Sequence, residues 1–234
     1  EGDADEEGDS GGCRHPHFEA RRVILEAAKT LQALAGRVGS SFDRAVALIE
    51  SVPPGGRVVL TGVGKSGHVA RKVAASMSST GTCAFFIHAT EALHGDLGSV
   101  RAGDVCIAIS YSGETQETLA AMRGFQKLSG GCIAITSNPR SSLGRECDVC
   151  LELGSITELD HNRLAPTAST AAAMALGDAL TVVISKRRGF TRGDFDLFHP
   201  GGQLGLQNKM ALRAERELEE QLLATGDKMA EEKL

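Results

Sequence analysis

Five short apolar runs of strand length alternate with segments of helical periodicity through the middle of the chain. We expect strands at residues 57–61, 83–88, 105–110, 132–136 and 149–153. These runs are apolar on both faces, and helical segments separate them. That combination is typical of a parallel sheet with helices packed on both sides. The pattern therefore predicts an α/β fold with three layers, αβα, around a five-stranded, parallel, doubly wound sheet.

Apolar residues at three- and four-residue steps mark the expected helices. They cover residues 18–35, 42–50, a segment opening after 62 and ending at 78, 91–97, 115–128, a short segment from 141, and a long Ala-rich segment at 167–188. A hydroxyl of Thr167 or Ser169 could cap the last of these helices. Residues 1–16 are acidic and Gly-rich and are expected to be disordered. Residues 17–205 are expected to form the domain, followed by a charged, partly helical tail at 206–234.

Composition narrows the function classes. Hydrophobic residues make up 41% of the chain and charged residues 24%, as in an ordinary globular protein. Trp is absent, the net charge is −5 and the longest basic cluster is 186–188, so we expect no nucleic-acid partner. No apolar run approaches the roughly 20 residues of a membrane span. With no signal-peptide core visible either, we expect no membrane association.

The six cysteines mostly fall in apolar, strand-like runs, where a reduced thiol behaves as a small core residue. Cys147 and Cys150 have the spacing of a redox or zinc half-site. On a strand, however, positions three apart face opposite sides, and no second such pair exists. We therefore expect no metal site and a reducing, cytoplasmic location.

Two glycine- and hydroxyl-rich loops each follow an expected strand and open a helix. In the first, GVGKSGH at 62–68, the spacing of Gly62, Gly64 and Gly67 matches a dinucleotide fingerprint. Lys65 and Ser66 suit a terminal phosphate or a polar sugar better than a planar cofactor. The loop is not a Walker A motif, because that motif requires a glycine five residues before Gly64, where this chain has Val59.

The second loop, SYSGET at 110–115, contains Ser110, Ser112, Gly113 and Thr115. Its hydroxyls, the close backbone approach at glycine and the free N–H groups of the next helix make a seat for an anion. Parallel strands end at one edge of the sheet, so both loops would border one crevice. A phosphosugar fits such a polar crevice.

Ionisable side chains cluster near these loops or in the later blocks of the sequence. They are His94, Glu117, Glu158 and His199. Two of them also have an ordinary explanation. An acid in a first helical turn, such as Glu117, is often a partner of the helix dipole, and a lone His199 before Pro-Gly-Gly is more often structural than catalytic.

Several blocks of the sequence nevertheless resemble a known family, in order. The blocks are TGVGKSGHVARKVAASMSSTGT, HATEALHGDLG, IAISYSGETQE, LAPTASTAAAMALGDAL and GFTRGDFDLFHPGGQLG. They are similar to the sugar isomerase (SIS) domain, a flavodoxin-like fold, of D-arabinose 5-phosphate isomerases. The similarity spans about 18–205, and many members carry CBS domains after it. This chain resembles a form without them.

The resemblance implies roles for individual residues. It places the family's catalytic groups on Lys65, His94, Glu117, Glu158 and His199. It places phosphate contacts on the hydroxyls and glycines of both loops, namely Gly64, Ser66, Ser110, Ser112, Gly113 and Thr115. It also implies a homotetramer in which neighbouring subunits complete each active site. One departure is the segment LDHNR at 159–163, which differs from many relatives and could alter substrate contacts.

The implied reaction interconverts D-ribulose 5-phosphate and D-arabinose 5-phosphate through an enediol, without a metal or redox cofactor. Lys65 would stabilise the oxyanion, and a glutamate or histidine would move the proton. The sequence does not choose among Glu117, Glu158, His94 and His199. Two alternatives stay open: a non-catalytic SIS module that binds a sugar phosphate and regulates a partner, and an NAD-dependent dehydrogenase.

Overall fold

The sheet has five parallel strands in the order β2-β1-β3-β4-β5. In this computed structural model, residues 15–203, 205–215 and 217 are described. The strands are β1 (Val58–Gly62), β2 (Ala84–His88), β3 (Val105–Ile109), β4 (Gly131–Thr136) and β5 (Val149–Glu152). Each lies within one or two residues of its predicted position. The predicted doubly wound α/β fold is therefore confirmed.

The strand order reverses at β1, which has β2 on one side and β3 on the other. The chain leaves β1 towards one edge of the sheet and returns to build the other. In open parallel sheets, the loops that leave the carboxyl ends of the strands at such a point separate and leave a crevice. The two glycine-rich loops follow β1 and β3, so the topology brings both to this point.

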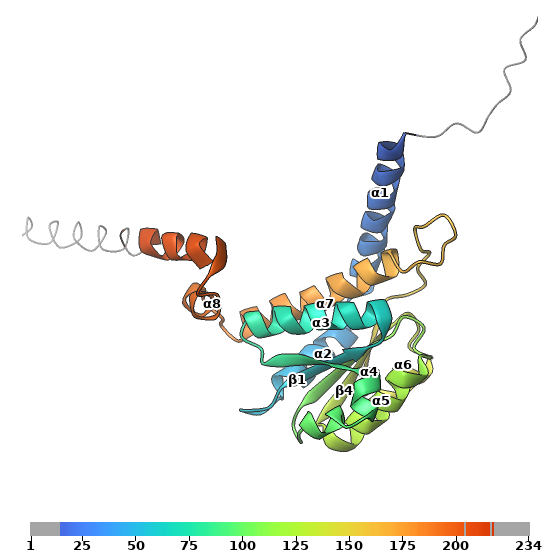
Figure 1. Ribbon diagram of the computed structural model, residues 1–234, viewed down its shortest axis with the longest axis horizontal. Helices are drawn as coiled ribbons and strands as arrows, with labels where there is room; N and C mark the ends of the chain where they lie inside the picture. The colour runs from blue at the N-terminus through green and yellow to red at the C-terminus, as the bar shows by residue number, and fades with distance from the viewer. Residues whose placement is uncertain (1–14, 204, 216, 218–234) are drawn as a thin grey trace, which may run out of the picture.

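Helices cover both faces of the sheet (Figure 1). One face is packed by α2 (Ser40–Glu50), α3 (Gly64–Ser79) and α7 (Ala168–Arg187), with α1 (Pro16–Ala35) lying against α7. The other is packed by α4 (Ala89–Leu93), α5 (Gln116–Leu128) and α6 (Ser142–Glu146). Alternate strand residues enter the two cores: Leu60 enters the first, and Val59 enters the second. This explains why the strands read as continuous apolar runs.

Two local features differ from the prediction. The helix expected at 91–97 is interrupted after α4 at His94 and Gly95, and a 3-10 helix follows at Asp96–Ser99. Gly95 has a φ of +125°, a conformation that ends a helix and that glycine adopts readily. An unpredicted helix, α8 (Arg192–Phe198), follows α7 and begins with a reciprocal capping box between Thr191 and Asp194.

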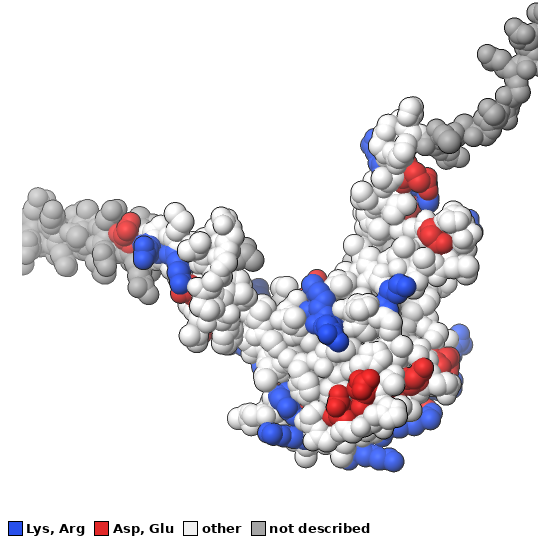
Figure 2. Space-filling view, in the orientation of Figure 1, with Lys and Arg blue, Asp and Glu red and all other residues white. Residues whose placement is uncertain are grey.

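The two predicted tails lie largely outside the described residues. Residues 1–14 fall there, as do 204, 216 and 218–234, so the expected disorder and most of the C-terminal tail stay predictions. The described part of 205–215 is helical. On the face shown in Figure 2, cationic and anionic side chains are interspersed and do not gather into one field.

Helix α7 is long and apolar enough to cross a membrane by length and composition, with a mean hydropathy of 1.5. The sequence predicts this segment as a long Ala-rich helix, but the expectation that no apolar run approaches the length of a membrane span is wrong. Half of the helix window is buried in the structure, and its side chains Ala172, Leu176 and Leu180 belong to the core on the α3 face. A core helix satisfies the same criterion, so this feature is weak evidence for a membrane segment.

The five described cysteines are free thiols. Cys147 and Cys150 pack against the same core cluster. The prediction that the two side chains face opposite sides of one strand does not apply, because Cys147 lies at the end of α6 and only Cys150 lies in β5. Burial raises the pKa of both thiols, that of Cys150 to about 11. Both are protonated at neutral pH, unlike reactive cysteines.

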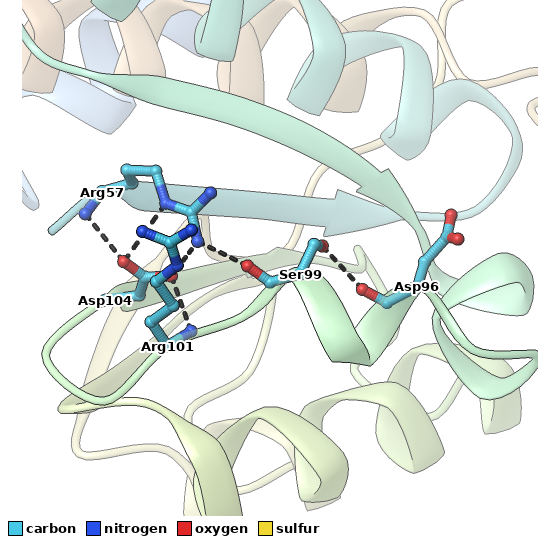
Figure 3. Close-up of polar contacts among 5 residues, drawn as sticks. All are labelled: Arg57, Asp96, Ser99, Arg101 and Asp104. Carbon is cyan, nitrogen blue, oxygen red and sulfur yellow. Dashed lines mark hydrogen bonds and ion pairs between the residues drawn. The ribbon is translucent and has the colours of Figure 1, made fainter.

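A buried carboxylate fixes the start of β3 to the start of β1 (Figure 3). Asp104 is fully buried and accepts hydrogen bonds from the backbone N–H groups of Arg57 (2.8 Å) and Arg101 (3.0 Å). The Arg57 guanidinium donates to Asp104 Oδ2 at 2.8 Å and to the carbonyl of Ser99 at 2.5 Å. This network therefore ties the end of the 3-10 helix, in the segment that carries His94, to the sheet.

Replacing Asp104 by Asn is expected to lower the free energy of unfolding by about 3 kcal/mol, because the change removes one partner of a buried ion pair. Urea unfolding measures this. Asp148→Asn is the matched control, since the exposed Asp148 carboxylate also accepts a backbone N–H at a strand, that of Cys132 at 2.8 Å. A loss at Asp104 no greater than at Asp148 would contradict the prediction.

The same variant gives a pH dependence. Burial acts to raise the pKa of the Asp104 carboxyl, but the hydrogen bonds from Arg57 and Arg101 outweigh it and hold that pKa below its ordinary value. A depressed pKa stabilises the fold above the unfolded-state pKa of about 3.9. The stability difference between wild type and Asp104→Asn should therefore be constant at neutral pH and shrink as the pH falls below about 4 towards the folded-state pKa.

Candidate active site

A cleft of about 640 Å³ lies at the carboxyl end of the sheet. Three parts of the chain line it: the start of α3, the loop after β3, and the segment from β5 into α7. Its polar lining includes Lys65, Ser66, Tyr111, Glu158, Arg163 and Ser169. The structure therefore brings Lys65, Ser66 and Glu158 together, as the sequence predicts for a crevice beside the two loops.

The glycines of the first loop allow α3 to start directly above the end of β1. A Cβ on Gly62 would lie 2.9 Å from the carbonyl oxygen of Ile109, and one on Gly67 would lie 2.8 Å from that of Gly62. Gly64 has a φ of +56°. These contacts account for the GxGxxG spacing by packing alone, and they place Lys65 and Ser66 in the first turn of α3, at the cleft.

Lys65 is exposed, and within the described residues its ammonium group has no hydrogen-bond or ion-pair partner. A free cation beside the N-terminus of a helix is a favourable place for an anionic ligand.

The second loop is held together by its own hydroxyls. Ser110 is 3% exposed, and its Oγ lies 3.0 Å from Thr115 Oγ1 and accepts the Gly113 N–H at 3.2 Å. Ser112 is exposed, and its Oγ accepts the Glu114 N–H at 3.2 Å. Their assignment as phosphate contacts stays a prediction, and in this structure the hydroxyls shape the loop.

Gly113→Ala is expected to lower the free energy of unfolding by at least about 2 kcal/mol, through backbone strain and a collision. Gly113 has a φ of +68°, and a Cβ there would collide with Ser141 Oγ. Gly55→Ala is the control, because Gly55 has a φ of +83° with open space around it. Chemical unfolding should show the larger loss at Gly113, and equal losses would mean that the loop moves aside.

Glu158 caps the N-terminus of α7. Its Oε2 accepts hydrogen bonds from the N–H of Thr167 (2.7 Å), the hydroxyl of Thr167 (3.1 Å) and the N–H of Ser169 (3.3 Å). The expected cap by a hydroxyl of Thr167 or Ser169 is wrong, because the carboxylate of Glu158 takes that place. Burial acts to raise the pKa of the Glu158 carboxyl, but these hydrogen bonds outweigh it and hold the pKa below its ordinary value. Oε1 makes none of them, so it is the oxygen available to a ligand.

Three predicted catalytic residues lie outside this cleft. His94 ends α4 and Glu117 lies in the first turn of α5, and both are exposed on helices that pack against each other. His199 follows the last residue of α8. Its ring stacks on that of Phe195, with the ring centroids 3.8 Å apart, and its Nδ1 lies 2.9 Å from the Phe195 carbonyl oxygen. Figure 1 shows α8 beyond the C-terminal end of α7, while the cleft is at its N-terminal end. A helix of this length measures about 30 Å.

Tyr111 and Arg163 line the cleft but were not among the predicted site residues. The Tyr111 hydroxyl accepts the N–H of Ile156 at 2.7 Å and donates to its carbonyl at 3.1 Å, which joins the loops after β3 and β5. Only its position inside the SYSGET loop indicated such a role. Arg163 belongs to the LDHNR segment. The only sequence signal for its role was that this segment differs from many relatives.

A model of the SIS domain matches residues 54–183 of this chain. The chain belongs to the SIS domain family. Among curated proteins, it is 44% identical over 186 residues to arabinose 5-phosphate isomerase KpsF of Escherichia coli O6:H1 strain CFT073, covering 79% of this chain and 56% of that protein. It is 48% identical over 174 residues to arabinose 5-phosphate isomerase KdsD of Shigella flexneri, covering 74% of this chain and 51% of that protein.

This SIS domain also resembles solved structures. A protein of E. coli CFT073, solved in complex with arabinose 5-phosphate, superposes with a TM-score of 0.75 at 40% identity, covering 79% of this chain and 97% of that one. A phosphosugar isomerase homologue from Bacteroides fragilis, described as involved in capsule formation, gives 0.75 at 33% identity, with the same coverages. The chain thus matches nearly all of these solved chains, but spans only about half the length of the curated relatives it matches.

Proposed function

We propose that this protein is an aldose–ketose isomerase that interconverts D-ribulose 5-phosphate and D-arabinose 5-phosphate. The observation that carries the proposal is the match to 97% of a chain solved with arabinose 5-phosphate. The names of the curated relatives agree with it. The cleft adds chemistry that suits the reaction: a free cation at Lys65, a hydroxyl at Ser66 and an ionised carboxylate at Glu158.

The reaction moves one proton between neighbouring carbons. A base removes a proton from C1 of ribulose 5-phosphate, the electron pair forms the C1–C2 double bond, and the ketone oxygen takes up negative charge. A proton taken up by that oxygen gives the 1,2-enediol. Loss of the proton from the C1 hydroxyl and return of a proton to C2 then give the aldehyde at C1 and a hydroxyl at C2. Lys65 would stabilise the oxyanion. Binding of the phosphate at the loops would hold the reacting carbons in place.

Among the four proton-transfer candidates, Glu158 is the one that lines the cleft beside Lys65. Hydrogen bonds fix its Oε2 and leave Oε1 for the substrate. A base must first be within reach of the proton that it removes. We therefore assign the base to Glu158 Oε1, and we give Glu117, His94 and His199 supporting roles in binding or from a neighbouring subunit.

The same proposal includes a cytoplasmic homotetramer with active sites shared between subunits. The position of His199 supports the sharing, since α8 lies beyond the far end of α7 from the cleft (Figure 1). Exposed apolar side chains on projecting helices support assembly: Phe18 and Ile24 on α1, and Leu197 on α8. The free thiols support a reducing compartment.

Mixing two inactive variants tests the sharing of sites. Lys65→Met and His199→Ala should each be inactive alone, and mixed subunits should regain about a quarter of wild-type activity, because random assembly rebuilds that share of sites. Light scattering measures the assembly in parallel. If the mixture stays inactive while subunits exchange, both residues act within one chain. Activity of His199→Ala alone would mean that His199 is not needed.

Thermal melting separates the isomerase from its alternatives. A ligand that binds the folded state raises the melting temperature. Ribulose 5-phosphate and arabinose 5-phosphate should both do so, and NAD should not. Stabilisation by NAD alone would overturn the proposal. Stabilisation by sugar phosphates without any conversion would leave the regulatory SIS module.

A further inference from the structure

The segment between β5 and α7 contains a tight turn organised by Asp160. The Asp160 carboxylate accepts backbone N–H groups of Leu164 (2.8 Å), Ala165 (2.9 Å) and Asn162 (3.1 Å). Its carbonyl accepts the N–H of Arg163 at 3.0 Å. We call residues 160–165 the Asp160 turn. In Figure 1 the segment that contains it projects beside α1 at the N-terminal end of α7.

Arg163 sits in this turn in an unfavourable backbone conformation. Its φ is +55°, and it is the one non-glycine residue with a positive φ in the described part of the chain. Left-handed backbone is disfavoured for a residue with a Cβ, and glycine adopts it freely. Nothing in the turn needs the arginine side chain, because the Asp160 carboxylate bonds only to backbone groups. The side chain is therefore held here at a conformational cost.

The Arg163 side chain borders the cleft that holds Lys65, Ser66 and Glu158. It is exposed, and its guanidinium has no hydrogen-bond or ion-pair partner among the described residues. The anion in the cleft, Glu158, is already engaged by Thr167 and Ser169. Lys65 and Arg163 thus give the cleft two unpaired cations.

A second hollow, on the α1 side of the same segment, is a poorer destination for this guanidinium. Arg163 also borders it. Two of its other cations are already paired, Arg22 with Glu19 at 2.6 Å and Lys29 with Glu26 at 2.8 Å. Neither of these two is free to bind a further anion, and the carboxylates of Glu19 and Glu26 would repel a phosphate there.

We propose that Arg163 is a substrate-binding residue that uses its guanidinium to bind the phosphate of the sugar phosphate in the cleft. A guanidinium binds phosphate through two parallel hydrogen bonds, with geometry that a single ammonium group cannot supply. The inference rests on the proposed function and deepens it, because it makes the Asp160 turn a determinant of preference for phosphorylated over neutral sugars. Arg163 contributes to binding and not to proton transfer.

Two variants separate binding from backbone strain. Arg163→Gln removes the charge and keeps the disfavoured φ, and Arg163→Gly removes both. Both should raise KM for ribulose 5-phosphate about tenfold or more with kcat within about twofold, the pattern of lost uniform binding. Arg163→Gly should also melt at a higher temperature than Arg163→Gln, because glycine relieves the φ. Arg163→Lys should fall between wild type and Arg163→Gln.

The control is Arg101→Gln, another exposed arginine, at the amino end of β3, whose side chain makes none of the hydrogen bonds in its network. It should leave KM unchanged. If the Arg163 variants match this control in KM while wild type converts ribulose 5-phosphate, the inference is overturned and the proposed function stands.

A binding measurement keeps the inference testable if the enzyme proposal fails. Thermal shifts with arabinose 5-phosphate and with inorganic phosphate are measured for wild type, Arg163→Gln and Arg101→Gln. Smaller shifts in Arg163→Gln alone support the inference, even without turnover. Equal shifts in all three proteins, or no shift in wild type with either ligand, overturn it.

Discussion

Glu158→Gln is expected to lower kcat by about a hundredfold to ten-thousandfold, the usual contribution of a general base. Glutamine has the shape of glutamate, and its carbonyl oxygen can still accept the N–H groups of Thr167 and Ser169 that Oε2 accepts now. The cap of α7 should therefore survive, with a loss of stability below about 1 kcal/mol. Steady-state kinetics and a melting curve of the same preparation measure both effects.

Glu117→Gln is the informative comparison. Glu117 is an exposed carboxylate in the first turn of α5 and does not line the cleft. If Glu158 is the base, its variant should lose far more kcat than the Glu117 variant. A large loss of kcat in Glu117→Gln, with near wild-type kcat in Glu158→Gln, would assign the proton transfer to Glu117. Another arrangement of subunits would then have to bring Glu117 to the substrate.

The pH profile gives a further check on this assignment. Because the pKa of Glu158 is held below its ordinary value, its carboxylate stays ionised below the pH at which a free glutamate, with a pKa of about 4.3, takes up a proton. Its stabilising contribution is present above about pH 4.3 and is lost as the pH falls through the folded-state pKa. An acid limb near pH 6 to 7 would therefore not come from Glu158. If it appears in kcat, and not only in kcat/KM where the second ionisation of the substrate phosphate near pH 6 also contributes, it would point to a histidine.

Lys65→Met is expected to reduce kcat/KM by about a hundredfold to a thousandfold, because it removes the cation that we propose stabilises the developing oxyanion. Methionine keeps much of the length and flexibility of the side chain. Lys65 has no ion pair in the described residues, so stability should change little. The loss should appear in kcat and not only in KM, since the oxyanion forms in the transition state.

Lys72→Met is the matched control on the same helix. Lys72 pairs with Asp178 of α7 in an exposed contact, and such pairs contribute little to stability. Its activity should stay within about twofold of wild type. Equal losses at Lys65 and Lys72 would mean that the effect comes from the general charge of α3 and not from the cleft.

The fold was predictable because its determinants are local. Each strand is a continuous apolar run such as 105–109, and the loops after β1 and β3 carry glycines at positions where a Cβ would collide with neighbouring atoms. The break at Gly95 was missed because Leu93 and Leu97 keep helical spacing across it. The short helix α8 was missed because its glycine-containing surroundings read as loop, although a capping box organises its start. Local periodicity indicates neither the break nor this helix.

The site was predictable only in part, because several of the polar groups that the sequence offers as ligand contacts make hydrogen bonds within the protein. Lys65 and Ser66 lie at the cleft as expected. The hydroxyl of Ser110 looks like a ligand in the sequence, yet it bonds within its own loop. Glu158 reaches an N–H group nine residues further along the chain, and no local rule for helix caps predicts such a partner. His199 ends α8, away from the cleft, and the subunit assembly that would bring it to a neighbouring site is part of the proposal.

The central claim is best tested by incubating the protein with D-ribulose 5-phosphate in deuterium oxide and following the products by NMR. We predict accumulation of D-arabinose 5-phosphate with deuterium at C2, because a proton returned from a side chain exchanges with solvent in the enediol mechanism. Glu158→Gln, which is expected to keep the fold, serves as the low-activity control. Binding of ribulose 5-phosphate by the folded wild-type protein, with no arabinose 5-phosphate formed, would contradict the account.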